Sequence, residues 1–140
     1  QMEGGYIVII DKDEMVMANL MEFARRFNIQ SATISGLGVL KNSKLGFYHL
    51  DRKRYDEKVF PQECELLNLT GNITWCEERP VIHIHVTLTD TDFKAFGGHL
   101  FEAQVGITLE IFVAARRERI ERKSNPEIGL NLQQLYSTRS

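Results

Sequence analysis

The 140-residue sequence lacks the features that mark secreted and membrane-spanning proteins. Its two cysteines, Cys64 and Cys76, form no C-x-x-C pair, so we interpret both as buried small hydrophobic residues in a reducing compartment. There is no run of about 18 apolar residues and no charged-then-apolar leader. We therefore expect a cytoplasmic protein without a membrane span.

Two classes of phosphate-binding protein are also disfavoured. Gly36-x-Gly38 has no third glycine and no following Gly-Lys-Ser/Thr, which argues against a nucleotide-binding loop. The net charge of −2 gives the chain no overall attraction to nucleic-acid phosphates. The exception is the segment 116–123, with five basic and two acidic residues. Such a run is more often a solvated face or an intersubunit salt-bridge ladder than a DNA contact.

The hydrophobic pattern predicts one helix and a series of strands. Apolar residues at helical spacing from Val16 to Phe27 predict an amphipathic helix of about 14 residues, with Asp11 or Asp13 as its N-cap and Glu14 in its first turn. Strands are expected at 6–10, 31–40, 44–50, 57–60, 63–75, 81–89 and 104–115, and segment 124–132 is expected to fold back onto the sheet. Because strands follow the helix rather than alternate with helices, the fold class is α+β, a compact and largely antiparallel sheet with one main helix packed on it.

Three of the four histidines lie close together in the sequence, at His83, His85 and His99. Residues i and i+2 of a strand point to one face, so His83 and His85 stand side by side, opposite an apolar row that includes Ile82 and Ile84. Polar residues on a solvated face are an equally good interpretation of this pair alone. His99 follows two glycines that permit close backbone approach, and it favours a metal site. Three imidazoles and a water suit zinc or a related divalent transition metal.

The pattern leaves several roles open for Glu102 and gives His49 no place in the metal site. Glu102, three residues after His99, could be a fourth ligand, orient a histidine, act as a general base on bound water, or be a solvated carboxylate. His49 has no partner at a comparable spacing. We interpret it as a surface or strand histidine.

Five segments, in this order along the chain, resemble the plants-and-prokaryotes-conserved (PPC) domain family: 32–38, 45–48, 65–73, 83–86 and 97–100. The whole match extends from about residue 5 to 132. The resemblance implies a single PPC-like domain over 1–140 that assembles as a homotrimer. It also implies that His83, His85 and His99 can hold a metal ion, as in prokaryotic members.

The same resemblance carries a DNA-binding label that fits this chain less well. Plant members carry AT-hooks with an Arg-Gly-Arg-Pro core, and this motif does not occur here. The plant hexapeptide Gly-Arg-Phe-Glu-Ile-Leu is replaced by residues 62–67. The chain therefore resembles a prokaryotic DNA-binding or regulatory type without an AT-hook, and DNA is a weakly supported partner.

Two functions are consistent with these patterns. The first is a homotrimeric regulatory module with a structural or ligand-sensing metal site. The second is a metal-dependent enzyme, hydrolase-like or lyase-like, acting on a small molecule at an open metal position with Glu102 as a base. We favour the module, because no nucleophile elbow, cofactor fingerprint or carboxylate pair supports catalysis.

Overall fold

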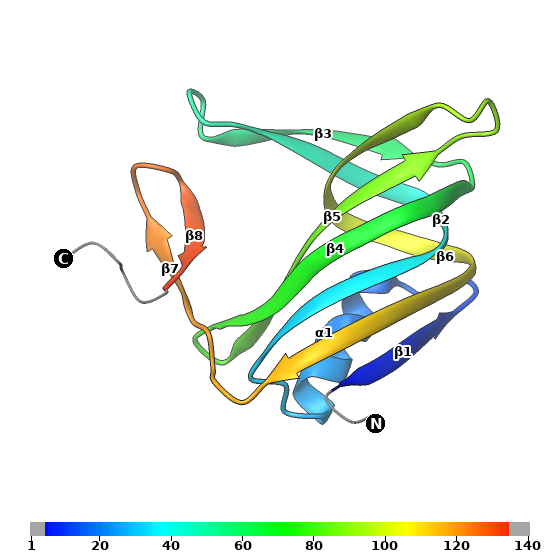
Figure 1. The fold of residues 1–140 in the computed structure, drawn as a ribbon. Coiled ribbons are helices and arrows are strands. Elements are labelled where there is room, and N and C mark those ends of the chain that lie inside the picture. Colours follow the sequence, from blue (N-terminus) through cyan, green and yellow to red (C-terminus); the bar gives the residue numbers. More distant parts are fainter. Residues whose placement is uncertain (1–4, 135–140) are drawn as a thin grey trace.

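A computed structural model describes residues 5–134, so the ends of the domain predicted over 1–140 lie outside the described residues. The elements in chain order are β1 (Tyr6–Asp11), α1 (Val16–Arg26), β2 (Ser31–His49), β3 (Arg54–Phe60), β4 (Cys64–Cys76), β5 (Arg79–Thr89), β6 (Ala95–Arg116), β7 (Arg122–Asn125) and β8 (Leu130–Gln133). The predicted α+β class is confirmed. One helix lies against a strongly curved antiparallel sheet (Figure 1).

The main sheet has the strand order β1-β6-β5-β4-β2-β3, and β6 also pairs with β2. These pairings form a closed ring of β2, β4, β5 and β6, in which all neighbours are antiparallel. Strand β6 makes this closure, because its first residues, 95–99, pair with β5 and the rest of the strand pairs with β2. Its later residues also pair with β1 on their other side. The two ends of one strand thereby contribute to two separate regions of the sheet.

Strand β6 begins nine residues earlier than the strand expected at 104–115, and the added part contains His99. A Cβ atom at Gly97 would collide with the Val86 carbonyl oxygen, and one at Gly98 would lie 2.8 Å from the Gly46 carbonyl oxygen. The two glycines therefore allow the backbone of β6 to pass close to both neighbouring strands. The strands expected at 31–40 and 44–50 are one continuous strand with register irregularities near Asn42.

Helix α1 has 11 residues, shorter than the expected 14 or so, and buries Val16, Leu20, Phe23 and Ala24, as its spacing predicts. Phe27 lies past the end of the helix and is 48% exposed, so its expected place on the buried face is wrong. The expected N-cap is wrong, because the cap position is Met15 and its side chain makes no capping hydrogen bond. Glu14 precedes the cap, so its expected place in the first turn is also wrong. Asp13 instead forms an ion pair with Lys41, with 2.6 Å between Oδ1 and Nζ. Within residues 5–134, no helix is long and apolar enough to cross a membrane.

The C-terminal segment forms its own hairpin of β7 and β8, seen beside the main sheet in orange and red in Figure 1. The Tyr48 hydroxyl donates to the Ile128 carbonyl, and Lys53 Nζ donates to the Pro126 carbonyl at 2.7 Å. These hydrogen bonds hold the hairpin against the end of β2 and the turn to β3, which together with β3 we call the β2–β3 arm. The segment predicted to fold back onto the sheet therefore forms a hairpin beside it. Cys64 lies in the core as expected, whereas Cys76 is only partly buried.

Candidate metal centre

Strand β5 has two chemically different faces. Ile82, Ile84, Val86 and Leu88 are buried in the core, as the alternation predicts. His83 and His85 lie on the opposite face, the first half-buried and the second exposed. The strand therefore presents two imidazoles on the face away from the core, where a third group can meet them.

That third group is His99. Strand β6 places it directly opposite His85 in the β5–β6 pairing. The ring centroids are separated by 5.0 Å for His83 and His85, 5.3 Å for His83 and His99, and 5.7 Å for His85 and His99. One nitrogen of each ring lies within 4.8 Å of the others. The structure thus brings together all three histidines that the sequence singles out.

The protonation and bonding of these rings fit a metal-binding role. Burial, with a smaller contribution from Arg122, lowers the pKa of His83 to about 4. Burial and the neighbouring His85 also lower the pKa of His99. His99 Nδ1 is buried and has no hydrogen-bond partner among the described residues, an arrangement that costs free energy unless a ligand occupies the lone pair. Neutral imidazoles are the form that coordinates divalent ions.

Glu102 lies elsewhere. Its Oε1 accepts hydrogen bonds from the Met17 and Ala103 backbone N–H groups, each at 2.9 Å. The carboxylate therefore caps the first turn of α1, where negative charge is favourable. The register of β2 and β6 shifts at Phe101, between His99 and Glu102. The structure does not bring Glu102 to the histidines, so neither a ligand role nor a base role follows from its geometry.

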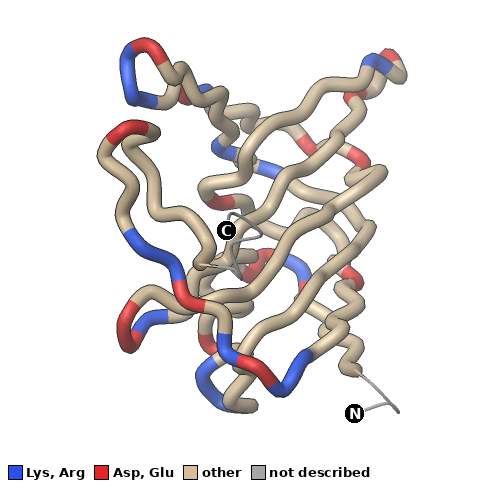
Figure 2. Tube along the Cα trace, turned by 60° about the vertical axis from the view of Figure 1, so that its left-hand side comes forward, with Lys and Arg blue, Asp and Glu red and all other residues tan. Residues whose placement is uncertain are grey.

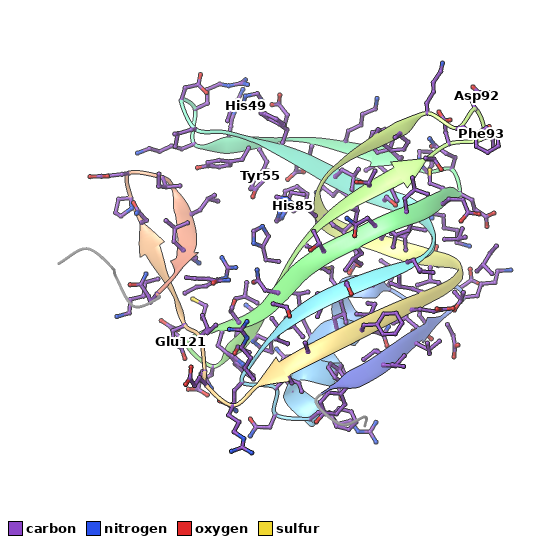
Figure 3. The ribbon with its side chains drawn as sticks, in the orientation of Figure 1. His49, Tyr55, His85, Asp92, Phe93 and Glu121 are labelled. Atoms are coloured by element: carbon purple, nitrogen blue, oxygen red, sulfur yellow. The ribbon has the colours of Figure 1, made fainter. Side chains whose placement is uncertain are left out.

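His49 also lies outside the cluster, as expected. Its Nε2 is 2.8 Å from Asp56 Oδ2 on the β2–β3 arm. Figure 3 shows His49 farther out along this arm, whereas Tyr55 lies close to the histidine face that includes His85. The Tyr55 ring centroid is 4.9 Å from that of His99, and burial raises the pKa of the Tyr55 hydroxyl.

Arg122 is the site residue that the sequence interpretation missed. Its Nη2 donates to Asn72 Oδ1 at 2.9 Å and lies 3.3 Å from His83 Nδ1. Its Nε donates to Thr74 Oγ1 at 2.7 Å, and its Nη1 donates to the Asn131 carbonyl at 3.0 Å. No ion pair within residues 5–134 includes this guanidinium. Arg122 is one of five basic residues in segment 116–123, and nothing in the sequence indicates which of the five side chains contacts the histidine site.

A pocket of about 250 Å³ opens between the histidines and the β7–β8 hairpin. It is lined by His83, His99, Arg122, Tyr55 and Asn131 and by the apolar side chains Val81, Ile82, Leu130 and Leu132. A separate hollow of about 240 Å³ adjoins His83 and His85 on the β4 side. A small molecule therefore has access to the histidine cluster from the hairpin side.

Among the other basic side chains of segment 116–123, Arg119 already has partners within the chain. The Arg119 guanidinium lies 4.4 Å from the Trp75 ring centroid, and its Nε is 2.5 Å from Glu121 Oε1. Figure 2 shows blue and red alternating along the trace of this segment, so its basic residues are interrupted by acidic ones. With Arg122 turned into the histidine site, Arg116, Arg117 and Lys123 are the remaining cations of the run.

The comparisons with known proteins agree with this architecture. The family model of the Plants and Prokaryotes Conserved (PCC) domain matches residues 2–116. A solved structure from Ralstonia eutropha JMP134, called a "putative DNA-binding protein", is 37% identical, with a TM-score of 0.90 over 96% of this chain and 94% of that one. A plant- and prokaryote-conserved (PPC) protein of Pyrococcus horikoshii is 32% identical, with a TM-score of 0.87 over 94% and 91% of the two chains.

A third structure bears on the histidines. It is named a metal-containing protein of Archaeoglobus fulgidus and is 29% identical, with a TM-score of 0.86 over 96% of each chain. No curated protein sequence matches the chain.

Proposed function

We propose that this chain, which belongs to the Plants and Prokaryotes Conserved domain family, is a homotrimeric regulatory module. In this proposal His83, His85 and His99 bind a divalent transition-metal ion, and that ion is zinc. The observation that carries the proposal is the meeting of three imidazole nitrogens within 4.8 Å of one another. The unpaired Nδ1 of His99 supports it, as does the name of the metal-containing relative.

The ligand set favours an open metal position. Structural zinc sites usually have four protein ligands, whereas sites that bind a water or a small molecule usually have three. The described residues offer three histidines and no cysteine or carboxylate within the same cluster. A bound divalent ion supplies Lewis acidity at the open position. The chain's own residues would hold the ion and shape the pocket beside it.

The open position also supports the second candidate, a metal-dependent hydrolase-like or lyase-like enzyme. The pocket of about 250 Å³ beside His83 and His99 is the specific observation in its favour. Since the Glu102 carboxylate caps α1, that enzyme would need a different proton acceptor. We therefore prefer a binding role for the site.

Homotrimer formation is supported by a patch of exposed apolar side chains on the outer face of the sheet. Ile7, Ile9, Leu37 and Phe112 are 47%, 54%, 50% and 47% exposed, respectively. They come from neighbouring strands β1, β6 and β2, and a groove of about 440 Å³ adjoins Ile7 and Phe112. Contiguous apolar surface of this kind is typical of protein interfaces. We propose that copies of this chain cover it.

The name of the Ralstonia relative raises DNA as a partner. For this chain, such contact would depend on the three cations of segment 116–123 that make no contact with the histidine site or with Trp75. Phosphate contacts by Lys and Arg supply most non-specific affinity for DNA. We therefore propose that any direct DNA binding by this chain is weak, and that regulation acts through the metal site.

The metal proposal is tested by elemental analysis of protein that was purified without a histidine tag and without chelators. We expect stoichiometric transition metal in the wild-type protein and its loss in His83→Ala and in His99→Ala. His49→Ala is the matched control, because it removes a histidine of the same sheet that pairs with Asp56 outside the cluster. Wild-type protein without metal, or a His99→Ala protein with unchanged metal, would contradict the proposal.

A further inference from the structure

The contact between Arg122 and His83 conflicts with metal binding at His83. A neutral imidazole has one nitrogen lone pair and one N–H group, and a guanidinium is only a donor. Because Arg122 donates to His83 Nδ1, that nitrogen holds the lone pair and Nε2 carries the proton. An ion at Nδ1 would displace the Arg122 N–H group. An ion at Nε2 would require the proton on Nδ1, which could then no longer accept the hydrogen bond.

Either mode of coordination therefore releases one N–H group of Arg122. The other three hydrogen bonds, to Thr74, Asn72 and Asn131, do not involve the histidines and keep the guanidinium in place. A guanidinium has five N–H groups. Four are paired before an ion binds, so two would be unpaired afterwards. Arg122 lines the pocket beside His83 and His99, so these donors would be available to a ligand there.

The charge at this place is also unbalanced. Arg122 has no carboxylate partner within residues 5–134, and a divalent ion at the histidines would add positive charge a few ångströms away. Two like charges in a partly desolvated pocket repel each other unless an anion lies between them. A carboxylate matches the planar donors of a guanidinium and is a common ligand of divalent ions.

On the basis of the proposed metal centre, we infer that the pocket between the histidines and the β7–β8 hairpin binds a small carboxylate, which contacts the metal with one oxygen and Arg122 with the other. The apolar side chains Val81, Leu130 and Leu132 at the same pocket favour a short apolar group on this carboxylate. Metal and carboxylate then bind cooperatively, because the metal frees the donor that the carboxylate uses.

The test uses the full chain loaded with Co(II), whose visible absorption reports its ligands, and propionate as the probe. Propionate should change the Co(II) spectrum of the wild-type protein with a measurable Kd, whereas neutral propionamide should not. In Arg122→Gln, the Kd for propionate should rise by about tenfold or more, as expected for loss of a charge-assisted hydrogen bond. Co(II) affinity without propionate should become tighter, because the variant removes the positive charge beside the ion and weakens the donor that competes for His83.

Lys123→Gln is the matched control, since it removes the same charge from the adjacent, exposed position of the hairpin. An equal loss in both variants, or no loss in Arg122→Gln, would overturn the inference. A wild-type protein that takes up no Co(II) would instead overturn the proposed metal centre.

A second measurement needs no variant and covers the case in which Arg122→Gln disturbs the hairpin. In the wild-type protein, saturating propionate should raise Co(II) affinity, measured by chelator competition, by the same factor by which Co(II) raises propionate affinity. Propionamide at the same concentration should have no effect. Equal Co(II) affinity with and without propionate would contradict the inference.

Discussion

The outer face of the main sheet contains a row of cross-strand neighbours whose two ends differ in chemistry. The row runs from β1 through the later part of β6, then β2, β4 and β5, and returns to the early part of β6, in the order Ile7, Phe112, Ser35, Thr70, His85 and His99. Its first end exposes apolar side chains, and its last end carries two imidazoles, of which His85 is exposed and His99 is partly buried. Ser35 and Thr70 separate the two.

This difference shows how one sheet face can serve two purposes. Apolar side chains gain about 25 cal/mol for each Å² removed from water and need no precise partner, so the Ile7 and Phe112 end suits association of copies. Imidazoles gain little from burial and need a directed bond, so the His85 and His99 end suits a bound ion. Strand β6 supplies residues to both ends because it bends and pairs with different strands along its length.

The first prediction removes the apolar end and leaves the histidine end intact. Phe112→Asp places a carboxylate in the exposed apolar patch, where covering it by another copy would require desolvating the charge. Light scattering should report three times the 16.1 kDa chain mass for the wild-type protein and the single-chain mass for the variant. Metal content per chain should be unchanged.

Phe93→Asp is the control for that substitution. Phe93 is 90% exposed but lies in the turn between β5 and β6, away from the patch, as Figure 3 shows. The Phe93→Asp protein should have the same mass in light scattering as the wild-type protein. If Phe112→Asp also lost its metal, the two ends would not be independent, and a second copy would be part of the histidine site. A monomeric wild-type protein would contradict trimer formation.

The sequence predicts the histidine end better than it predicts the surroundings of that end. The alternation around His83 and His85 is a local property of one strand, and it correctly places Ile82 and Ile84 in the core. The two glycines before His99 indicate its place in the site, although the sequence predicts no strand at that position. Gly97 has low strand propensity, and only the close passage of β5 and β2 explains why the backbone pairs there.

Glu102 and Arg122 could not be assigned from the sequence, because their roles depend on distant partners. Glu102 accepts from Met17, which is 85 residues away in the chain, and a register shift at Phe101 breaks the simple spacing from His99. Arg122 reaches His83 across 39 residues from a separate hairpin. Local periodicity contains no information about either contact.

The second prediction tests whether Glu102 of β6 stabilises helix α1 without taking part in metal binding by His99 of the same strand. Glu102→Ala removes the acceptor for the Met17 N–H group at the start of α1, and it should lower the free energy of unfolding by about 1–2 kcal/mol. Urea denaturation at fixed protein concentration measures the change, since stability of an oligomer depends on concentration. Glu102→Gln keeps an oxygen acceptor and should lose less.

Metal affinity is the second readout for Glu102, and it should be the same in both variants as in the wild-type protein. Glu22→Ala removes an exposed carboxylate from the same helix and should change stability by no more than about 0.5 kcal/mol. A Glu102→Ala protein with wild-type stability and weakened metal binding would reverse the assignment, placing the carboxylate in the metal site rather than at the helix.

The smallest effect is expected for the basic segment that joins β6 to the hairpin, which belongs to neither end of the row. At about 150 mM salt, fluorescence anisotropy should give weak binding to duplex DNA without sequence preference, with a Kd of about 10 μM or weaker. Arg117→Gln should weaken it further, whereas Arg119→Gln should have less effect, because Arg119 already pairs with Glu121 and stacks on Trp75. Nanomolar affinity for one sequence at this salt concentration would show that DNA, rather than the metal site, dominates the function of the chain.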